Sequence, residues 1–216
     1  MRTRDPHLPG RLLLAERDTL LPRLRRLPET AFTLRTACPG WCVREVLAHC
    51  GAALLRIVEG RTEGAFSPEA NAADVAEREH WPVDRVLDEL ERGFSEAGPV
   101  IAAGDGRLDV IGLGEWVHAG DVRDALGEAD AYDGPGTGEA LSLLEVVSRE
   151  RETPRVHVGL PGRAEPLLLG NAVPGRPPAR LTSDASTLVR LYTGRPLVGT
   201  RYTLRGAEES ELVVYG

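Results

Sequence analysis

Residues 115–123 read Glu115-Trp116-Val117-His118-Ala119-Gly120-Asp121-Val122-Arg123, and residues 41–49 read Trp41-Cys42-Val43-Arg44-Glu45-Val46-Leu47-Ala48-His49. On a helix, Glu115 and His118 project from one face because they are three residues apart. If the two segments are helices packed side by side, His49 meets that face. Two imidazoles and one carboxylate then form a facial metal site with open coordination positions, which can bind a thiolate or a water.

The rest of the N-terminal part is also predicted to be helical. Apolar residues recur with a helical period, so that residues 1–150 are expected to form an up-and-down bundle. Cys42 occupies the expected N-cap of the helix that carries His49, and Glu45, three residues later, fits a capping box. The predicted helices are 8–27, 43–58, 70–78, 83–102, 111–126 and 138–149.

The pattern changes near residue 153, where short alternating segments replace the helical period. Residues 151–216 are therefore predicted to form a small α+β domain, and the whole chain is assigned to the α+β class. One helix is expected over 183–191, with Ser183 as its N-cap. The predicted strands are 155–160, 165–169, 179–182, 201–204 and 211–215.

Composition narrows the function classes. The chain has 216 residues and a net charge of −7, which argues against a nucleic-acid partner because such partners need a basic surface. All 26 basic residues are Arg, so Schiff-base chemistry on a Lys is excluded. A chain without Lys is also typical of a G/C-rich genome, such as that of an actinobacterium.

Targeting signals and cysteines give further expectations. No apolar run approaches the ~20 residues of a membrane span, and the N-terminus lacks the apolar stretch of a signal peptide. We therefore expect a cytoplasmic protein without a membrane partner, and a monomer by default. Cys38, Cys42 and Cys50 give no disulfide framework, and no second pair completes a zinc site. Their predicted role is that of small buried residues.

Three stretches resemble the mycothiol-dependent maleylpyruvate isomerase family, within the wider DinB-like group of metalloenzymes. They are residues 36–49 (Thr36 to His49), residues 115–127 (Glu115 to Gly127) and residues 188–196 (Leu188 to Pro196). The resemblance implies a DinB-like four-helix bundle that holds a divalent metal, usually zinc. It also implies that mycothiol, the low-molecular-weight thiol of actinobacteria, binds near the metal.

We expect His49, Glu115 and His118 to be the zinc ligands, with Asp121 orienting His118. One departure concerns the carboxylate: the resemblance implies a ligand four residues before His118, where this chain has Gly114. Trp41 and Trp116 are predicted to wall the pocket, and Arg190 to meet an anionic ligand.

These residues predict a metal-dependent enzyme that uses mycothiol on a small electrophilic substrate. A metal-activated thiolate adds to an electrophilic carbon. Loss of the thiol after bond rotation gives isomerisation, whereas retention gives a conjugate, and the sequence leaves both outcomes open. Two alternatives remain: a metal-dependent hydrolase with metal-bound water as the nucleophile, or a non-catalytic small-molecule-binding protein that has lost the metal.

Overall fold

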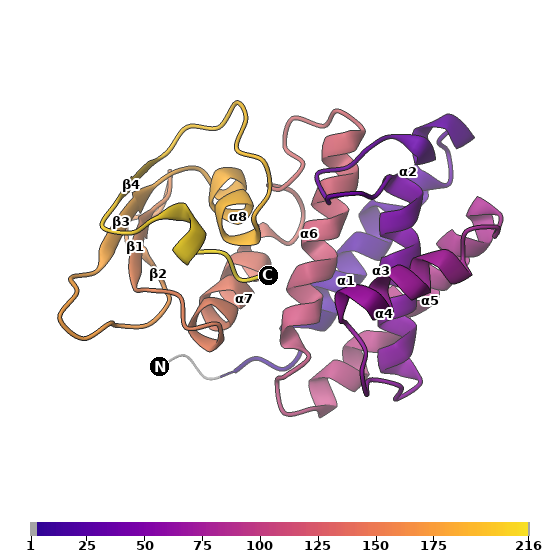
Figure 1. Ribbon diagram of the computed structural model, residues 1–216, viewed down its shortest axis with the longest axis horizontal. Helices are drawn as coiled ribbons and strands as arrows, with labels where there is room; N and C mark the ends of the chain where they lie inside the picture. Colours follow the sequence, from indigo (N-terminus) through magenta and orange to yellow (C-terminus); the bar gives the residue numbers. More distant parts are fainter. Residues whose placement is uncertain (1–3, 216) are drawn as a thin grey trace. The chain divides into compact units, whose positions relative to one another are not determined.

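The computed structural model describes residues 4–215, which divide into two compact units between Ala131 and Tyr132 (Figure 1). The first unit is helical, and the second combines helices with a small sheet. The α+β fold class expected from the sequence is thus confirmed. None of the helices within residues 4–215 is long and apolar enough to cross a membrane.

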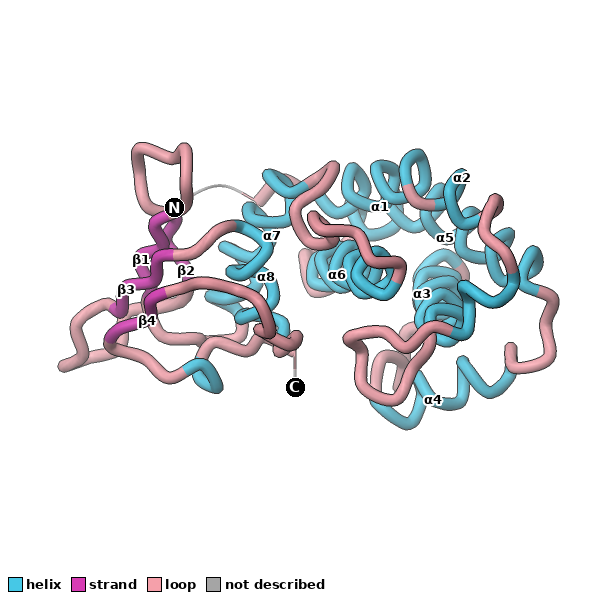
Figure 2. Tube along the Cα trace, turned by 90° about the horizontal axis from the view of Figure 1, so that it is seen from above, coloured by secondary structure: helices cyan, strands magenta, loops and turns pink. Residues whose placement is uncertain are grey.

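Four helices of the first unit form the expected bundle. Helices α3 and α1 each pack against both α5 and α6, and the short α4 packs against α3 (Figure 2). The bounds are α1 Leu8–Thr19, α2 Leu21–Leu24, the 3₁₀ helix η1 Glu29–Thr33, α3 Val43–Val58, α4 Pro68–Glu77, α5 Val83–Ala103 and α6 Asp109–Ala125. The helix predicted over 8–27 is therefore divided in two, and Pro22 lies in the first turn of α2, where its missing N–H costs little.

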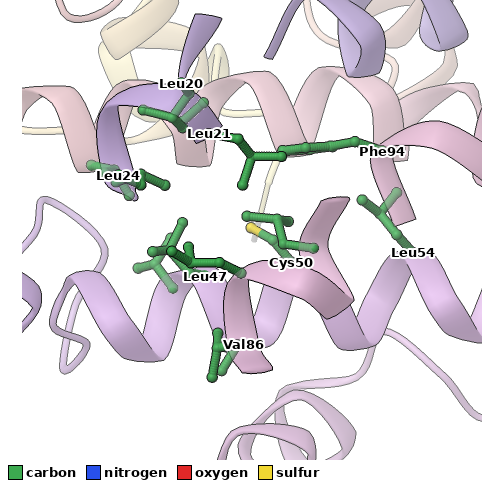
Figure 3. Close-up of a cluster of buried hydrophobic side chains, with 14 of the residues drawn as sticks. Leu20, Leu21, Leu24, Leu47, Cys50, Leu54, Val86 and Phe94 are labelled. Atoms are coloured by element: carbon green, nitrogen blue, oxygen red, sulfur yellow. The ribbon is translucent and has the colours of Figure 1, made fainter. Parts of the chain in front are cut away.

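Helix α3 runs through the centre of the apolar core. Its start carries the predicted capping box, in which Cys42 N donates to Glu45 Oε2 at 2.7 Å. Cys50 is fully buried among leucines of this core, as expected for a small apolar residue (Figure 3). The core therefore holds α3 firmly, and with it the side chains that α3 presents to α6.

The crossing of α1 and α5 depends on glycine. A Cβ atom added at Gly98 on α5 would lie 2.8 Å from the Cα of Gly10 on α1, closer than carbon atoms pack. The two backbones therefore touch where neither residue carries a side chain. This contact sets the spacing of one side of the bundle.

The second unit packs two helices on a four-stranded sheet. The strand order is β2-β1-β3-β4, with β1 and β3 parallel and the outer pairs antiparallel. Buried residues alternate along β1, β2 and β3, which matches a sheet covered on one face. The bounds are α7 Thr137–Glu150, β1 Val156–Gly159, β2 Leu167–Leu169, β3 Ala179–Thr182, α8 Ala185–Thr193, β4 Thr203–Arg205 and the 3₁₀ helix η2 Glu209–Glu211.

Three details of this unit differ from the sequence analysis. Asp184, rather than Ser183, caps α8, since its carboxylate accepts from Thr187 N at 2.6 Å. Residues 211–215 do not form a strand; Val214 N instead donates to Tyr192 O at 2.8 Å. Helix α7, expected within the domain 1–150, lies in the second unit and contacts β2 and α8.

Candidate metal centre

A tight turn positions Cys38 ahead of α3. Trp41 N donates to Cys38 O at 3.2 Å, with Pro39 and Gly40 between them and a φ of +83° at Gly40. Pro followed by a residue with positive φ is the arrangement of a type II turn. The hydroxyl of Thr36 accepts from Cys38 N at 3.2 Å and donates to Trp41 O at 3.0 Å. These bonds hold both ends of the turn, so that Cys38 has a defined position.

His49 on α3 and His118 on α6 lie face to edge. Their ring centroids are 5.2 Å apart and the rings are nearly perpendicular, at 84°. Trp41 also contacts His49, with ring centroids 4.9 Å apart. The two helices thus bring together the two imidazoles that the sequence analysis singled out, next to one of the two tryptophans expected at the site.

Asp121 and Cys38 complete a cluster around His118. His118 Nδ1 donates to Asp121 Oδ2 at 3.0 Å, and the carboxylate of Asp121 is fully buried. Ligand atoms of Cys38, His118 and Asp121 all lie within 4.8 Å of one another. Among residues 4–215, this is the one group of three or more His, Cys, Asp or Glu residues that meets that spacing. The sequence analysis did not include Cys38 in the site.

Glu115 lies apart from this cluster, and helix geometry explains why. An α-helix turns about 100° per residue, so Glu115 lies about 60° to one side of His118 and Asp121 about 60° to the other. The Glu115 carboxyl is buried against Cys50, whose thiol hydrogen-bonds it, while Glu115 Oε2 has no hydrogen-bond partner within residues 4–215. Burial raises the pKa of Glu115 to about 8. The geometry therefore does not group Glu115 with His118, and its place in the ligand set stays a prediction.

His49 is a neutral imidazole with a nitrogen to spare. Burial, and secondarily the neighbouring His118, lowers the pKa of His49 to about 3. Its Nδ1 is buried and has no hydrogen-bond partner within residues 4–215. A buried polar atom without a partner is costly, and a bound ligand or ion is one common reason for it. His49 therefore offers a lone pair beside the cluster of Cys38, His118 and Asp121.

The remaining predicted site residues have other surroundings. Trp116 is 1% exposed and belongs to the packed interior of α6. Arg190, in the second unit, places its guanidinium 4.3 Å from the ring centroid of Tyr132 and donates to Pro196 O at 3.2 Å. The predicted roles of Trp116 as a pocket wall and of Arg190 in binding an anion stay untested.

The donor set suits a divalent metal. Thiolate sulfur, imidazole nitrogen and carboxylate oxygen are the groups that bind zinc in proteins. One thiolate from Cys38 and one carboxylate from Asp121 would balance the two positive charges of the ion, which matters because Asp121 is fully buried. The orphaned Nδ1 of His49 points to the same conclusion, so the residues present fit the metal that the family resemblance implies.

Comparisons with known proteins identify relatives of the helical unit and of the fold. Residues 13–107 match the family described as "Mycothiol maleylpyruvate isomerase N-terminal domain". Two solved structures share the fold: the mycothiol-dependent maleylpyruvate isomerase (TM-score 0.59) and a histidine-to-alanine mutant of it (TM-score 0.58). Both are 16% identical to this chain, and each match covers 96% of this chain and 98% of the other. A comparison with curated proteins finds no match. Residues 13–107 of the helical unit are thus similar to the N-terminal domain of the mycothiol maleylpyruvate isomerases, and the chain shares the fold of the two solved structures.

Proposed function

We propose that the protein is a metal-dependent enzyme that uses mycothiol to isomerise, or to conjugate, a small unsaturated acid. The observation that carries this proposal is the contact of His49 on α3 with His118 on α6, beside Cys38 and Asp121, in a bundle of this family. Maleylpyruvate, which the solved relatives are named for, is the first substrate to try.

The protein's own residues supply the ligands and hold them in place. His118 is the central ligand, because it contacts His49 on one side and hydrogen-bonds Asp121 on the other. His49 stays uncharged at neutral pH, since its pKa is about 3, and so it does not repel a cation. Trp41 packs against His49 and limits the freedom of that ring.

A bound divalent metal lowers the pKa of a coordinating thiol, so that mycothiol would react as a thiolate near neutral pH. The bound thiolate would supply reversible addition to the alkene: its sulfur would bond one alkene carbon while the electron pair of the double bond moved onto the conjugated carbonyl. Rotation about the resulting single bond, followed by loss of the thiolate and return of the electron pair, would give the trans isomer. If a proton is captured first, the product is a thiol conjugate.

The experiment measures metal content together with activity. Zinc-loaded protein is mixed with maleylpyruvate, with and without mycothiol, and isomerisation is followed by absorbance. We expect turnover only with both zinc and mycothiol, and a loss of at least about 10²-fold in His118→Ala because a metal ligand is removed. The control is His157→Ala, because His157 is exposed on β1 and lies in the second unit.

Other outcomes select the alternatives. Metal-dependent hydrolysis of ester or amide substrates without any thiol would replace the proposal with a hydrolase that uses metal-bound water. A protein that takes up no metal, yet binds small molecules, would be a non-catalytic member of the fold. The presence of Gly114, where the family resemblance implies a carboxylate, is the feature that favours this last alternative.

A further inference from the structure

We propose that Cys38 is a metal ligand, and that this chain holds its metal through Cys38, His118 and Asp121. The inference rests on the proposed metal site and changes its ligand set. The expected set of His49, Glu115 and His118 contains no sulfur, whereas the cluster in the structure contains one thiol. A thiolate ligand makes the site softer and gives it a spectroscopic signature.

The position of Cys38 is the first argument. The turn formed by residues 38–41 is fixed by its own backbone bond and by the Thr36 hydroxyl at both ends. A side chain on such a turn is already ordered, so that little conformational entropy is lost when it binds an ion. Cys38 is also only half-buried, which leaves a path for an ion to reach it.

Asp121 supplies the carboxylate of the cluster, since this chain has Gly114 where the family resemblance implies one. Gly114 lies about 40° from His118 around the axis of α6, on the same side as Asp121, which lies about 60° away. Glu115 lies on the opposite side, buried against Cys50. Asp121 is therefore the carboxylate that shares this side of α6 with position 114, although it follows His118 along the helix and position 114 precedes it. It is fully buried, unlike the exposed carboxylates that cluster without binding metal.

The nitrogen of His49 is an independent sign that a ligand binds here. Its Nδ1 is buried and unpartnered within residues 4–215, and the His49 ring packs against His118. With three protein ligands from Cys38, His118 and Asp121, a tetrahedral ion keeps one open position. His49 lies beside the site through the contact of its ring with that of His118.

Metal uptake by this set balances in charge and protons. The Cys38 thiol forms the sulfur–metal bond and releases its proton to solvent. His118 binds as a neutral imidazole whose ring proton stays on the nitrogen that does not face the ion, so it adds no charge and releases no proton. The sum of one thiolate, one carboxylate and one divalent ion is neutral, which limits the desolvation cost of a site whose Asp121 is fully buried.

Cobalt(II) is the probe, because a thiolate ligand gives cobalt an intense charge-transfer band in the near ultraviolet that nitrogen and oxygen ligands do not. Full-length protein is chelated, dialysed and titrated with cobalt in the absence of any added thiol. We expect one equivalent to bind in wild type with this band. In Cys38→Ser the band should disappear and the affinity should fall at least about tenfold. Asp121→Asn should weaken binding and keep the band.

Two controls separate Cys38 from its neighbours. Cys42→Ser should keep the band, since serine is a better N-cap than cysteine and the start of α3 is preserved. Glu115→Gln should also keep both the band and the affinity, because Glu115 lies outside the cluster. Circular dichroism of each variant shows whether its helices are intact.

The proposal is overturned by cobalt that binds without a charge-transfer band, by a band that survives in Cys38→Ser, or by a protein that binds no cobalt. Loss of metal in Glu115→Gln but not in Cys38→Ser would establish the expected His49, Glu115 and His118 set instead. The proposed function fails separately: a thiolate-bound metal without mycothiol-dependent turnover would leave this inference standing and remove the isomerase.

Discussion

Glu115 lies three residues before His118 on α6, yet its carboxyl group is buried against Cys50 and its pKa is raised to about 8 from an ordinary value of 4.5. The folded protein thus keeps a proton on Glu115 that the unfolded chain releases. The stabilisation by protonated Glu115 is fully present below pH 4.5 and is lost as pH rises through about 8. Between these values the free energy of unfolding falls by up to about 1.4 kcal/mol per pH unit.

Glu115→Gln should remove this pH dependence, because glutamine resembles the protonated carboxyl and does not ionise. We expect the variant to gain stability relative to wild type as pH rises from about 5 to about 8. The measurement is urea unfolding of chelator-treated protein at several pH values. Glu63→Gln is the matched control, since Glu63 is exposed. Parallel pH profiles of wild type and Glu115→Gln would show that Glu115 ionises normally in the folded protein.

The contact between helices α1 and α5 can be tested by adding one methyl group to α5. Gly98→Ala places a Cβ 2.8 Å from the Cα of Gly10, and backbone cannot move aside as a flexible side chain can. We expect overpacking to cost about 1–3 kcal/mol, more than the ~1 kcal/mol that alanine gains in helix propensity.

The control for this effect is Gly138→Ala on α7, where an added Cβ meets nothing within 4 Å. There we expect a gain of about 0.4–1 kcal/mol, because alanine restricts the unfolded chain. Both variants are compared with wild type by urea unfolding. A Gly98→Ala protein at least as stable as wild type would mean that α1 and α5 separate easily.

Helix periodicity predicted α3, α5 and α6 to within two residues at each end, because each buries a long apolar stripe whose period fixes the element. The prediction of a strand over 211–215 was wrong. The apolar residues there suit a strand locally, but Val214 N donates to Tyr192 O instead. Likewise α7 has a regular helical period, but the period does not say which unit it packs against.

Part of the candidate site was predictable, because helix periodicity also predicts where the two histidines lie. The contact of His49 with His118 follows from two amphipathic helices and a family resemblance. The place of Cys38 does not, because it depends on how the turn before α3 folds over α6, a contact between residues 80 positions apart in sequence. The Pro39-Gly40 pair does predict a turn, and this is the one local signal that sets Cys38 apart from Cys42 and Cys50.

At the scale of the whole molecule, the aromatic residues divide between the two units. All three tryptophans, Trp41, Trp81 and Trp116, lie in the helical unit, whereas all four tyrosines, Tyr132, Tyr192, Tyr202 and Tyr215, lie in the second unit. Tryptophan fluorescence therefore reports on the helical unit, and tyrosine derivative absorbance reports on the second unit. Thermal unfolding can be followed for each unit within the intact chain.

Metal should stabilise the helical unit selectively, because every proposed ligand lies within it. Binding to the folded state alone adds about 2.7 kcal/mol at a metal concentration a hundredfold above Kd. We expect zinc to raise the midpoint of the tryptophan transition and a chelator to lower it, with a smaller change in the tyrosine transition. Equal shifts of both transitions would mean that the two units unfold as one cooperative block. The absence of any shift in wild type, at zinc concentrations that saturate the protein, would mean that the metal binds the unfolded chain as tightly as the bundle.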